Sequence, residues 1–363
     1  MNPKVNVLHI CGSFKRGGIT SFVRSILELN PVTANRHDLV VLFENEKINI
    51  PGTDVYCLGK YIGNPFRVFS RIRKIIKNYS LIMLHKAHPL VVFPLLFMRK
   101  RVLIFQHGMA VSRGFFLKRL IKKMWYSMVP ALLHGKVICS TEFAYGKTRK
   151  SGIRFSRRRV EIIPFGININ RRTRPLYNRE KLKKELLVGS AGIMSKIKRF
   201  DLLIKSLTNY TGKLNIHLRI AGEGPEKEFL SGLAARLTNK NVTVEFPGHV
   251  KDITAFYDSL DLFVFPSHNE SFGLVVLEAL SRGVPVALFP DVGGALPLIE
   301  NNGNGFVLND GVGGLEELWL KLNKDPLILM DMVKYINKMD LSAYDIKATR
   351  RKLETLSDDS VWR

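Results

Sequence analysis

The chain has 363 residues, of which 46% are hydrophobic and 24% are charged. This composition excludes a disordered, collagen-like or coiled-coil protein, and the length favours two domains. Lysine and arginine outnumber aspartate and glutamate by 56 to 31, which gives a formal net charge of +25. We expect such a charge to attract phosphate, whether on a nucleic acid, a lipid surface or a nucleotide.

The positive charge is concentrated in the first half of the chain. Residues 1–185 contain 36 basic and 9 acidic side chains, whereas residues 186–363 contain 20 and 22. Residues 51–150 alone contain 19 basic and only 2 acidic side chains. The first half is therefore predicted to meet an anionic partner that the second half does not.

Cysteine usage and hydropathy predict a protein of the reducing cytosol. Cys11, Cys57 and Cys139 form no CxxC pair and lie in or beside apolar runs, so we expect buried free thiols. The N-terminal apolar run is too short for a signal peptide. The most hydrophobic stretch, Pro89–Met98, is shorter than the roughly 20 residues that a membrane-spanning helix needs. We therefore expect no transmembrane segment.

Short apolar runs alternate with amphipathic stretches along the first half. The expected strands are Val5–Ile10, Leu39–Phe43, Leu81–Leu84, Val102–Gln106 and Lys136–Ser140. The expected helices are Ile19–Leu29, Arg67–Asn78 and Phe115–Met128. This alternation predicts a parallel sheet that is covered by helices on both faces.

The alternation breaks near Pro164 and Gly166, passes a basic linker and then restarts. The expected strands are Val188–Ile193, Leu214–Ala221, Val242–Phe246, Leu262–Pro266 and Pro285–Phe289. The expected helices are Asp201–Asn209, Pro225–Leu237, Ile253–Leu260 and Gly273–Arg282. We predict two doubly wound, Rossmann-like α/β domains, residues 1–170 and 171–335, that face a cleft and bind a phosphorylated small molecule at their carboxyl strand ends. Residues 336–363 form a helical tail, for which a return to the first domain is an open alternative.

Two carboxylates lie around the start of the last of these helices. Glu270 is expected in the loop before the helix, and Glu278 is expected inside it, half buried and in need of a partner. Gly273 begins the helix, whose first N–H groups can bind an anion or hydroxyl groups. On spacing alone, an acid that complements the helix dipole and a surface glutamate remain the plain alternative.

The residues from Glu270 to Glu278 resemble the EX7E signature of the family 4 retaining glycosyltransferases, which have the GT-B fold. Further matches to that family run in the same order along the chain: Gly17-Gly18, Gly222-Glu223-Gly224-Pro225, Phe246–Val250, Tyr257, Asp261, Gly293-Gly294 and Asn304–Val307. The resemblance implies a GT-B glycosyltransferase that uses a nucleotide sugar and needs no metal or other cofactor. The nine histidines also show no metal-ligand spacing.

The resemblance also implies roles for individual residues. Glu278 would bind the ribose, Glu270 would bind the donor sugar, and Lys198 would stabilise the departing diphosphate. The other implied donor-binding positions are Gly17, Gly18, Val250, Phe272, Gly273 and Leu274, with His249 beside the base. His107 resembles the family's N-domain histidine near the acceptor and the reacting sugar, although a bond to a strand-end carbonyl is the plain alternative, which we favour for His9 and His85.

Ile193 departs from the family, which has an arginine at this position. Lys196, Arg199, or Lys15 and Arg16 of the first glycine loop could supply the missing cation, or the activity could be weak or absent. The departure motivates an alternative function, a non-catalytic protein that binds sugar nucleotides or polyanions.

The predicted helix Phe115–Met128 carries a cluster of basic side chains: Lys118, Arg119, Lys122 and Lys123. Aromatic and apolar residues, including Trp125, are available opposite them. Basic amphipathic helices with interfacial aromatics are typical of proteins that lie on anionic membranes. A solvated basic face above a core-facing stripe is the alternative. We favour the membrane because of the basic excess in residues 51–150, and no recognition module for nucleic acid is evident.

The resemblance implies a retaining hexosyltransferase, and the basic helix favours a location at the cytoplasmic face of the cell membrane. The catalytic residues are expected to be His107, Lys198 and Glu270. A UDP-sugar is favoured over a GDP-sugar as the donor, and the acceptor is expected to be a lipid-linked, lipopolysaccharide or polysaccharide glycan.

Overall fold

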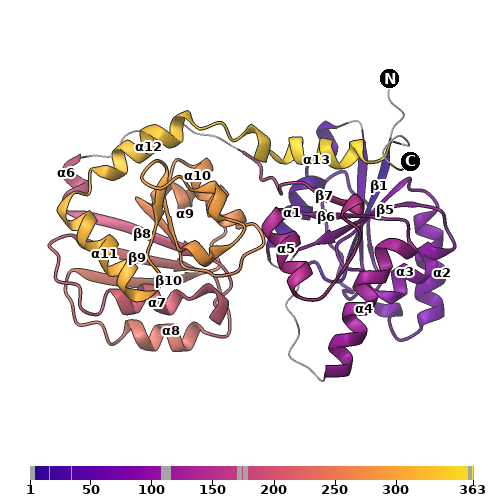
Figure 1. Cartoon of the computed structure of the whole chain (residues 1–363), viewed down its shortest axis with the longest axis horizontal. Helices are drawn as coiled ribbons and strands as arrows, with labels where there is room; N and C mark the ends of the chain where they lie inside the picture. Colours follow the sequence, from indigo (N-terminus) through magenta and orange to yellow (C-terminus); the bar gives the residue numbers. More distant parts are fainter. Residues whose placement is uncertain are drawn as a thin grey trace. The chain divides into compact units, whose positions relative to one another are not determined.

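Two parallel β-sheets organise the chain (Figure 1). The computed structural model describes residues 5–15, 17–33, 35–107, 116–169, 174, 179–358 and 362, without the side chains of residues 32, 116 and 117. One compact unit consists of residues 1–168 and 342–363, and the other consists of residues 169–341. We call them the first and the second domain.

The first domain contains a parallel sheet in the order β3-β2-β1-β4-β5-β6-β7. Its strands are β1 (Asn6–Cys11), β2 (Arg36–Val41), β3 (Val55–Cys57), β4 (Leu81–Leu84), β5 (Arg101–Gln106), β6 (Lys136–Cys139) and β7 (Val160–Ile162). Its helices are α1 (Gly18–Leu27), α2 (Pro65–Ile76), α3 (Pro89–Leu96), α4 (Phe116–Leu132), α5 (Glu142–Lys150) and α13 (Ile346–Thr355). The chain reverses its direction across the sheet between β1 and β4, which is a topological switch point.

The second domain repeats this plan with strands in the order β10-β9-β8-β11-β12-β13. Its strands are β8 (Glu185–Ala191), β9 (Asn215–Ala221), β10 (Val242–Gly248), β11 (Leu262–Phe265), β12 (Val286–Leu288) and β13 (Gly305–Val307). Its helices are α6 (Arg179–Leu182), α7 (Phe200–Ser206), α8 (Lys227–Ala234), α9 (Ile253–Ser259), α10 (Leu274–Ser281), α11 (Gly311–Lys324) and α12 (Ile328–Lys338). The switch point lies between β8 and β11. The predicted fold class, two Rossmann-like α/β domains, is thus confirmed.

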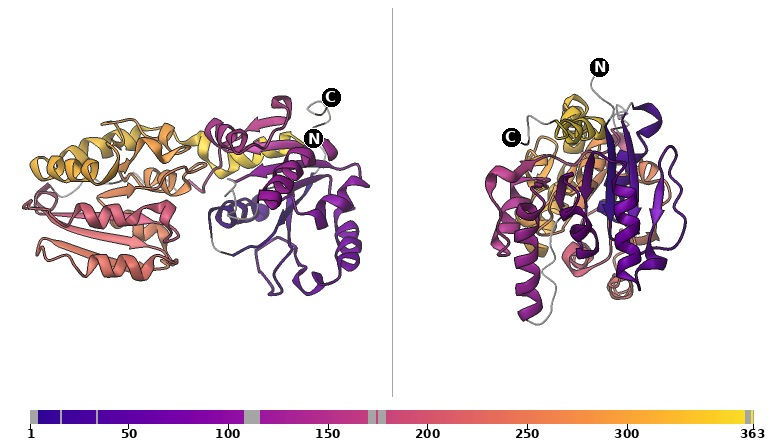
Figure 2. Two further views of the ribbon diagram at one scale, coloured as in Figure 1. Left: turned by 60° about the horizontal axis from the view of Figure 1, so that its bottom comes forward. Right: turned by 90° about the vertical axis from the view of Figure 1, so that its right-hand side faces the viewer.

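The two faces of the first sheet differ in polarity. Leu8 and Ile10 of β1 face a mainly apolar core to which α2, α3 and α4 contribute. A buried acid on this face, Asp38, accepts a hydrogen bond from the Tyr79 hydroxyl at 2.8 Å. His9 points to the opposite face, because successive side chains of a strand alternate. Helices α1 and α13 contact each other on that side, and Figure 2 shows helices above and below the sheets.

The sequence missed short or atypical elements. Strands β3, β7 and β13 have only three residues each, too few for a hydrophobic period. Helix α3 is apolar all round and contains Pro94, so it has no amphipathic pattern. Helix α11 begins with the glycine-rich segment Gly311-Val-Gly-Gly, which helices disfavour, and it is capped by Asp310, whose carboxylate accepts from the Gly311 N–H.

Helix α13 belongs to the first domain although it follows the second in sequence. The Ile346 N–H donates to the Ile167 carbonyl at 2.8 Å, and the Thr349 hydroxyl donates to the Pro164 carbonyl at 3.0 Å. A side chain at Gly166 would collide with this segment, since a Cβ there would lie 2.8 Å from the Asp345 carbonyl oxygen. The segment 342–358 is thereby docked on the first domain.

The cysteines are free in the structure. Cys11 and Cys139 are buried, as predicted, and burial raises the pKa of each thiol to about 12. Cys57 is only partly buried. Within the part of the chain that the structure describes, no helix combines the length and the hydrophobicity needed to cross a bilayer.

Candidate active site

The loop between β11 and α10 is held by backbone contacts at the switch point of the second domain. The Glu270 N–H donates to the Val292 carbonyl at 2.7 Å, and the Gly294 N–H donates to the Glu270 carbonyl at 2.8 Å. Gly273 then adopts φ 89° before α10 begins, and a Cβ there would lie 2.6 Å from that of Ala295. Only glycine therefore lets α10 start so close to this loop.

Lys198 and Glu270, two predicted catalytic residues, form an ion pair. The Lys198 Nζ lies 2.6 Å from Glu270 Oε1, and the Ser267 hydroxyl donates to the same oxygen at 2.6 Å. The side chains of Lys198 and Glu270 are 18% and 21% exposed, so the pair is shielded but reachable. An ammonium group and a carboxylate are thereby fixed beside the N-terminus of α10.

Glu278 has the partner that its position in a helix required. The Tyr257 hydroxyl donates to Glu278 Oε2 at 2.8 Å. Burial raises the pKa of Glu278, and the hydrogen bond from Tyr257 opposes that rise. The alternative of a simple surface glutamate is therefore wrong, because this carboxylate is partly buried and oriented.

Glycines bring the loops after β8 and β9 into contact. A Cβ at Gly222 would lie 1.9 Å from the Gly192 carbonyl oxygen, and one at Gly224 would lie 2.4 Å from the Met194 carbonyl oxygen. The Met194 N–H donates to the Glu223 carbonyl at 2.9 Å. This packing of the two loops supports the short segment that carries Lys198.

The basic side chains that could replace the arginine missing at position 193 differ in their partners and in their exposure. Ile193 itself is 52% exposed. Arg199 is committed elsewhere: its guanidinium binds both carboxylate oxygens of Asp291, at 2.9 and 2.6 Å, and its Nε donates to the Pro266 carbonyl. Lys196 and, in the first domain, Lys15 are exposed, and residue 16 lies outside the described residues.

The remaining predicted donor positions lie along the carboxyl edges of the sheets. Phe272 is buried, and Gly273 and Leu274 form the start of α10. Val250 and the exposed His249 directly follow β10. In the first domain, Gly17 precedes α1 with φ 148° and no atom within 4 Å of an added Cβ, and Gly18 is the first residue of that helix.

His107 directly follows β5 and binds another histidine. Its Nε2 lies 2.8 Å from Nδ1 of His85, so a strand-end carbonyl is not its partner there. Burial lowers the pKa of His107 to about 3, which keeps the ring uncharged at neutral pH. The ring therefore acts as a neutral hydrogen-bonding group.

A pocket beside the first glycine loop was missed by the sequence analysis. Glu44 Oε1 accepts from the Ser13 hydroxyl at 2.6 Å and from the Phe14 N–H at 2.8 Å, which ties the loop to the end of β2. The lining residues are Phe14, Lys15, Phe43, Glu44, Asn45, Glu46 and Ile48. The available signal was the position of Glu44, directly after a predicted strand.

Helix α4 exposes apolar side chains as well as basic ones. Lys118 and Arg119 are exposed, whereas Lys122 and Lys123 are partly buried. Trp125 packs inward, and its Nε1 donates to the Ala87 carbonyl at 2.8 Å. Its exposed apolar residues are Leu120, Met124, Met128 and Leu132, which are spaced four apart, and Ile121, which directly follows Leu120. Phe115 lies outside the described residues.

Among the described residues, no group of three or more histidine, cysteine, aspartate or glutamate side chains could hold a metal ion.

Residues 176–339 match the family model of glycosyl transferases group 1. Among curated relatives, an uncharacterized glycosyltransferase of Haemophilus influenzae is 31% identical over 155 residues, which is 39% of this chain and 43% of that protein. The capsular polysaccharide biosynthesis glycosyltransferase CapM of Staphylococcus aureus is 30% identical over 131 residues, or 36% of this chain and 34% of CapM. The matched segments thus span less than half of either relative.

Solved structures match over almost the whole chain. Anabaena HepE, solved with UDP and glucose, gives a TM-score of 0.76 at 20% identity and covers 97% of this chain and 99% of HepE. WaaG, a glycosyltransferase involved in lipopolysaccharide biosynthesis, gives 0.70 at 18% identity and covers 94% and 98%. These likenesses establish the GT-B fold, and the family match supports the prediction of a glycosyltransferase.

Proposed function

We propose that the protein is a retaining glycosyltransferase of family 4 that transfers a hexose-type sugar from a nucleotide sugar to a glycan. The observation that carries the proposal is the Lys198–Glu270 ion pair beside the N-terminus of α10. Open parallel sheets bind ligands at such a switch point. The match of residues 176–339 to glycosyl transferases group 1 supports the same activity.

The second domain offers one group for each part of a nucleotide sugar. Glu278, oriented by Tyr257, accepts hydrogen bonds from the ribose hydroxyls. Glu270 binds a hydroxyl of the sugar, and Lys198 lies close enough to the same site to meet the diphosphate. The first N–H groups of α10 add a positive end for the phosphates. We favour a UDP-sugar, because HepE was solved with UDP and glucose.

Catalysis depends on stabilising the charge that develops on the leaving diphosphate. A fixed cation next to such a charge is typically the largest catalytic contribution, and Lys198 is that cation. The acceptor hydroxyl attacks the anomeric carbon with retention, and its proton passes to an oxygen of the departing phosphate. His107, which burial keeps neutral, contributes a hydrogen bond to a sugar hydroxyl rather than a charge.

The acceptor in this proposal is a lipid-linked, lipopolysaccharide or polysaccharide glycan. CapM acts in capsular polysaccharide biosynthesis and WaaG in lipopolysaccharide biosynthesis, by their names. The exposed apolar row of α4, flanked by Lys118 and Arg119, suits an anionic membrane surface that carries such lipids. We place the protein at the cytoplasmic face of the membrane, where nucleotide sugars are made.

The experiment is sugar transfer by the purified protein. UDP- and GDP-sugars are incubated with membrane glycan acceptors, and the anomeric configuration of the product is read by NMR. We expect transfer with retention from a UDP-sugar. Binding of a nucleotide sugar without hydrolysis or transfer would instead favour the alternative that Ile193 motivates, a non-catalytic binding protein.

A further inference from the structure

Four histidines form a diagonal row on one face of the first sheet. In the register of the sheet, His37 of β2 pairs with Val7 of β1, two residues before His9. His9 in turn pairs with Met83 of β4, two residues before His85. His107 continues the diagonal after β5. Because side chains two residues apart share a face of a sheet, every step of this row stays on the side of α1 and α13.

The ring nitrogens of these histidines connect in one direction. Nε2 of His107 lies 2.8 Å from Nδ1 of His85, and Nε2 of His85 lies 2.9 Å from Nδ1 of His9. Nε2 of His9 lies 2.9 Å from Nδ1 of His37. Nε2 of His37 lies 2.9 Å from Oε1 of Glu354 on α13. The row thus runs from the edge of the sheet to a carboxylate on the last helix.

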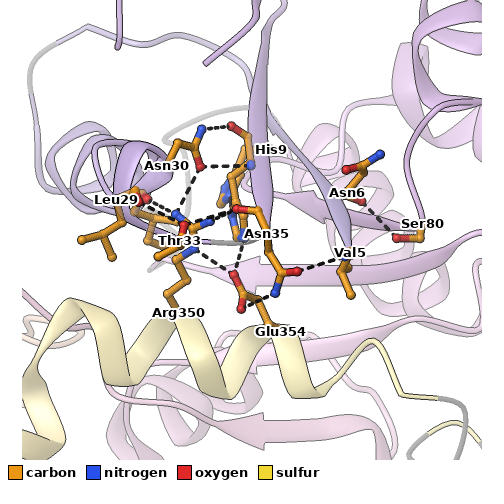
Figure 3. A network of polar contacts seen from close by, with 12 residues as sticks. Val5, Asn6, His9, Leu29, Asn30, Thr33, Asn35, Ser80, Arg350 and Glu354 are labelled. Carbon is orange, nitrogen blue, oxygen red and sulfur yellow. Dashed lines mark hydrogen bonds and ion pairs between the residues drawn. The ribbon is translucent and has the colours of Figure 1, made fainter. Parts of the chain in front are cut away.

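Glu354 is surrounded by hydrogen-bond donors (Figure 3). Arg350 Nε donates to Oε1 at 2.8 Å, and Asn35 Nδ2 donates to Oε2 at 2.8 Å. Burial raises the pKa of Glu354, but the hydrogen bonds from His37, Arg350 and Asn35 outweigh it and bring the pKa to about 2. The group is therefore an ionised carboxylate at neutral pH, and it can only accept hydrogen bonds.

The four imidazoles are neutral. Burial lowers the pKa of His37 to about 4 and that of His107 to about 3. Burial also lowers the pKa values of His9 and His85 well below the usual value, and the positive charge of Arg350 adds to this effect at His9. Each ring therefore carries a single N–H, which can be on either nitrogen.

The carboxylate decides which nitrogen carries the proton. Since Glu354 accepts only, His37 has its proton on Nε2 and must accept at Nδ1. His9 then donates from Nε2, and the same argument passes to His85 and to His107. All four rings become Nε2–H tautomers, and the row ends at His107 Nδ1, a nitrogen with a lone pair and no proton.

We propose that Glu354 is a positioning residue, which acts through His37, His9 and His85 to present Nδ1 of His107 as an acceptor for a substrate hydroxyl. The inference rests on the proposed function, because it assigns that hydroxyl to the sugar or the acceptor glycan. An apolar row would fill the same space without the cost of burying four polar rings. The row gives a defined direction to one hydrogen bond at the sheet edge.

The first test reads the tautomers directly. Histidine labelled with ¹⁵N is incorporated into the intact protein, and the protonated ring nitrogens are identified by NMR at neutral pH, with assignment by single histidine substitutions. We expect neutral Nε2–H tautomers at His9, His37, His85 and His107. An Nδ1–H tautomer at His107 would overturn the inference. This measurement needs no variant of Glu354 and no substrate.

The second test replaces Glu354, the carboxylate at the end of the histidine row. In Glu354→Gln the side-chain amide can donate as well as accept, so we expect His107 to populate both tautomers. We expect kcat to fall roughly 10- to 100-fold, by analogy with the loss on removing a partner that orients a metal-bound histidine, with KM for the nucleotide sugar unchanged. The matched control is Thr349→Ala, which removes a hydrogen bond of the same helix to Pro164 but does not touch the row.

The outcomes separate two failures. Unchanged tautomers and unchanged kcat in Glu354→Gln would overturn the role of Glu354, while sugar transfer by the wild type would still support the proposed function. Nε2–H tautomers without transfer of any sugar by the wild type would defeat the proposed function instead. An equal fall of kcat in Thr349→Ala would show that docking of α13, and not the direction of the row, matters.

Discussion

The two domains share one architecture but place different chemistry at the carboxyl edges of their sheets. In the second domain charged groups lie at the edge itself, in the Lys198–Glu270 pair and in the half-buried Glu278. In the first domain the edge carries the uncharged ring of His107, and the ionised Glu354 lies at the other end of the row. One fold can thus place charged groups at one sheet edge and a neutral ring at the other.

The largest expected difference between the domains is their sensitivity to acid. In the unfolded chain each histidine takes up a proton near pH 6.5, whereas burial lowers the pKa of His37 to about 4 and that of His107 to about 3 in the fold. The free energy of unfolding of the first domain is therefore highest above pH 6.5. Below that pH it falls by about 1.4 kcal/mol per pH unit for each such histidine. Glu354, with a pKa of about 2, adds its loss only at lower pH.

Hydrogen exchange at pH 7 and pH 5 checks this difference within one molecule. We expect amides of β1 and β4 to lose protection at pH 5 while those of β8 and β11 keep it. Equal loss in both sheets, or earlier loss in the second, would contradict the prediction.

Lys198→Ala tests the charged edge of the second domain. Without the ammonium, the leaving diphosphate loses its fixed cation, and we expect kcat to fall roughly 10²- to 10³-fold. The measurement is steady-state sugar transfer. Lys205→Ala is the control, because Lys205 forms an exposed ion pair with Asp201 on α7. An unchanged kcat for Lys198→Ala would remove the cation from the mechanism.

The glycine loops of the two domains allow a matched pair of substitutions. Gly222→Ala puts a Cβ against the Gly192 carbonyl, and Gly17→Ala puts one into open space, although both positions have positive φ. We expect Gly222→Ala to destabilise its domain by about 3 kcal/mol, and Gly17→Ala by about 1 kcal/mol from backbone strain alone. Thermal unfolding of both variants measures these losses of stability, and equal shifts in Tm would mean that the contact between the loops contributes nothing.

Glu278→Gln should weaken donor binding by roughly 10- to 100-fold, since a hydrogen bond to a charged group contributes about 1.5–3 kcal/mol. Calorimetric titration with the nucleotide sugar measures this affinity. Tyr257→Phe keeps the carboxylate but removes its orienting hydroxyl, so we expect a smaller loss. If both variants bind like the wild type, Glu278 does not contact the ribose.

The smallest expected effect concerns the membrane. Each basic side chain near an anionic surface contributes about 1 kcal/mol, so Lys118→Ala with Arg119→Ala should weaken binding to anionic vesicles roughly tenfold or more. Flotation with vesicles that contain phosphatidylserine measures it. Replacing Leu120 and Met124 by serine tests the apolar row separately. Binding that none of these changes affects would place the contact elsewhere.

The features that the sequence predicted well are those that one short segment contains. The alternation of apolar runs and amphipathic stretches follows from the periods of strands and helices, so the fold class could be derived. Glu270, Gly273 and Glu278 lie in one loop and one helix, and their arrangement follows from local geometry. Lys198, the ion-pair partner of Glu270, was predicted as a site residue only through the family resemblance.

The features that could not be predicted arise between distant segments. His9 and His85 are 76 residues apart, and His37 and Glu354 are 317 apart. Only the register between strands puts the histidines on one diagonal, only the docking of α13 brings Glu354 to His37, and single-sequence patterns carry neither. For the same reason the sequence could not tell that Arg199 binds Asp291 or that Trp125 turns inward on α4.

The docking of α13 has a consequence for synthesis in the cell. The ribosome makes the strands of the first domain early, but Arg350 and Glu354 emerge only after the whole second domain. Until then His37 lacks its carboxylate partner, and nothing fixes the direction of the hydrogen bonds along the histidine row. Because α13 is made last, the second domain can finish folding before α13 docks on the first domain.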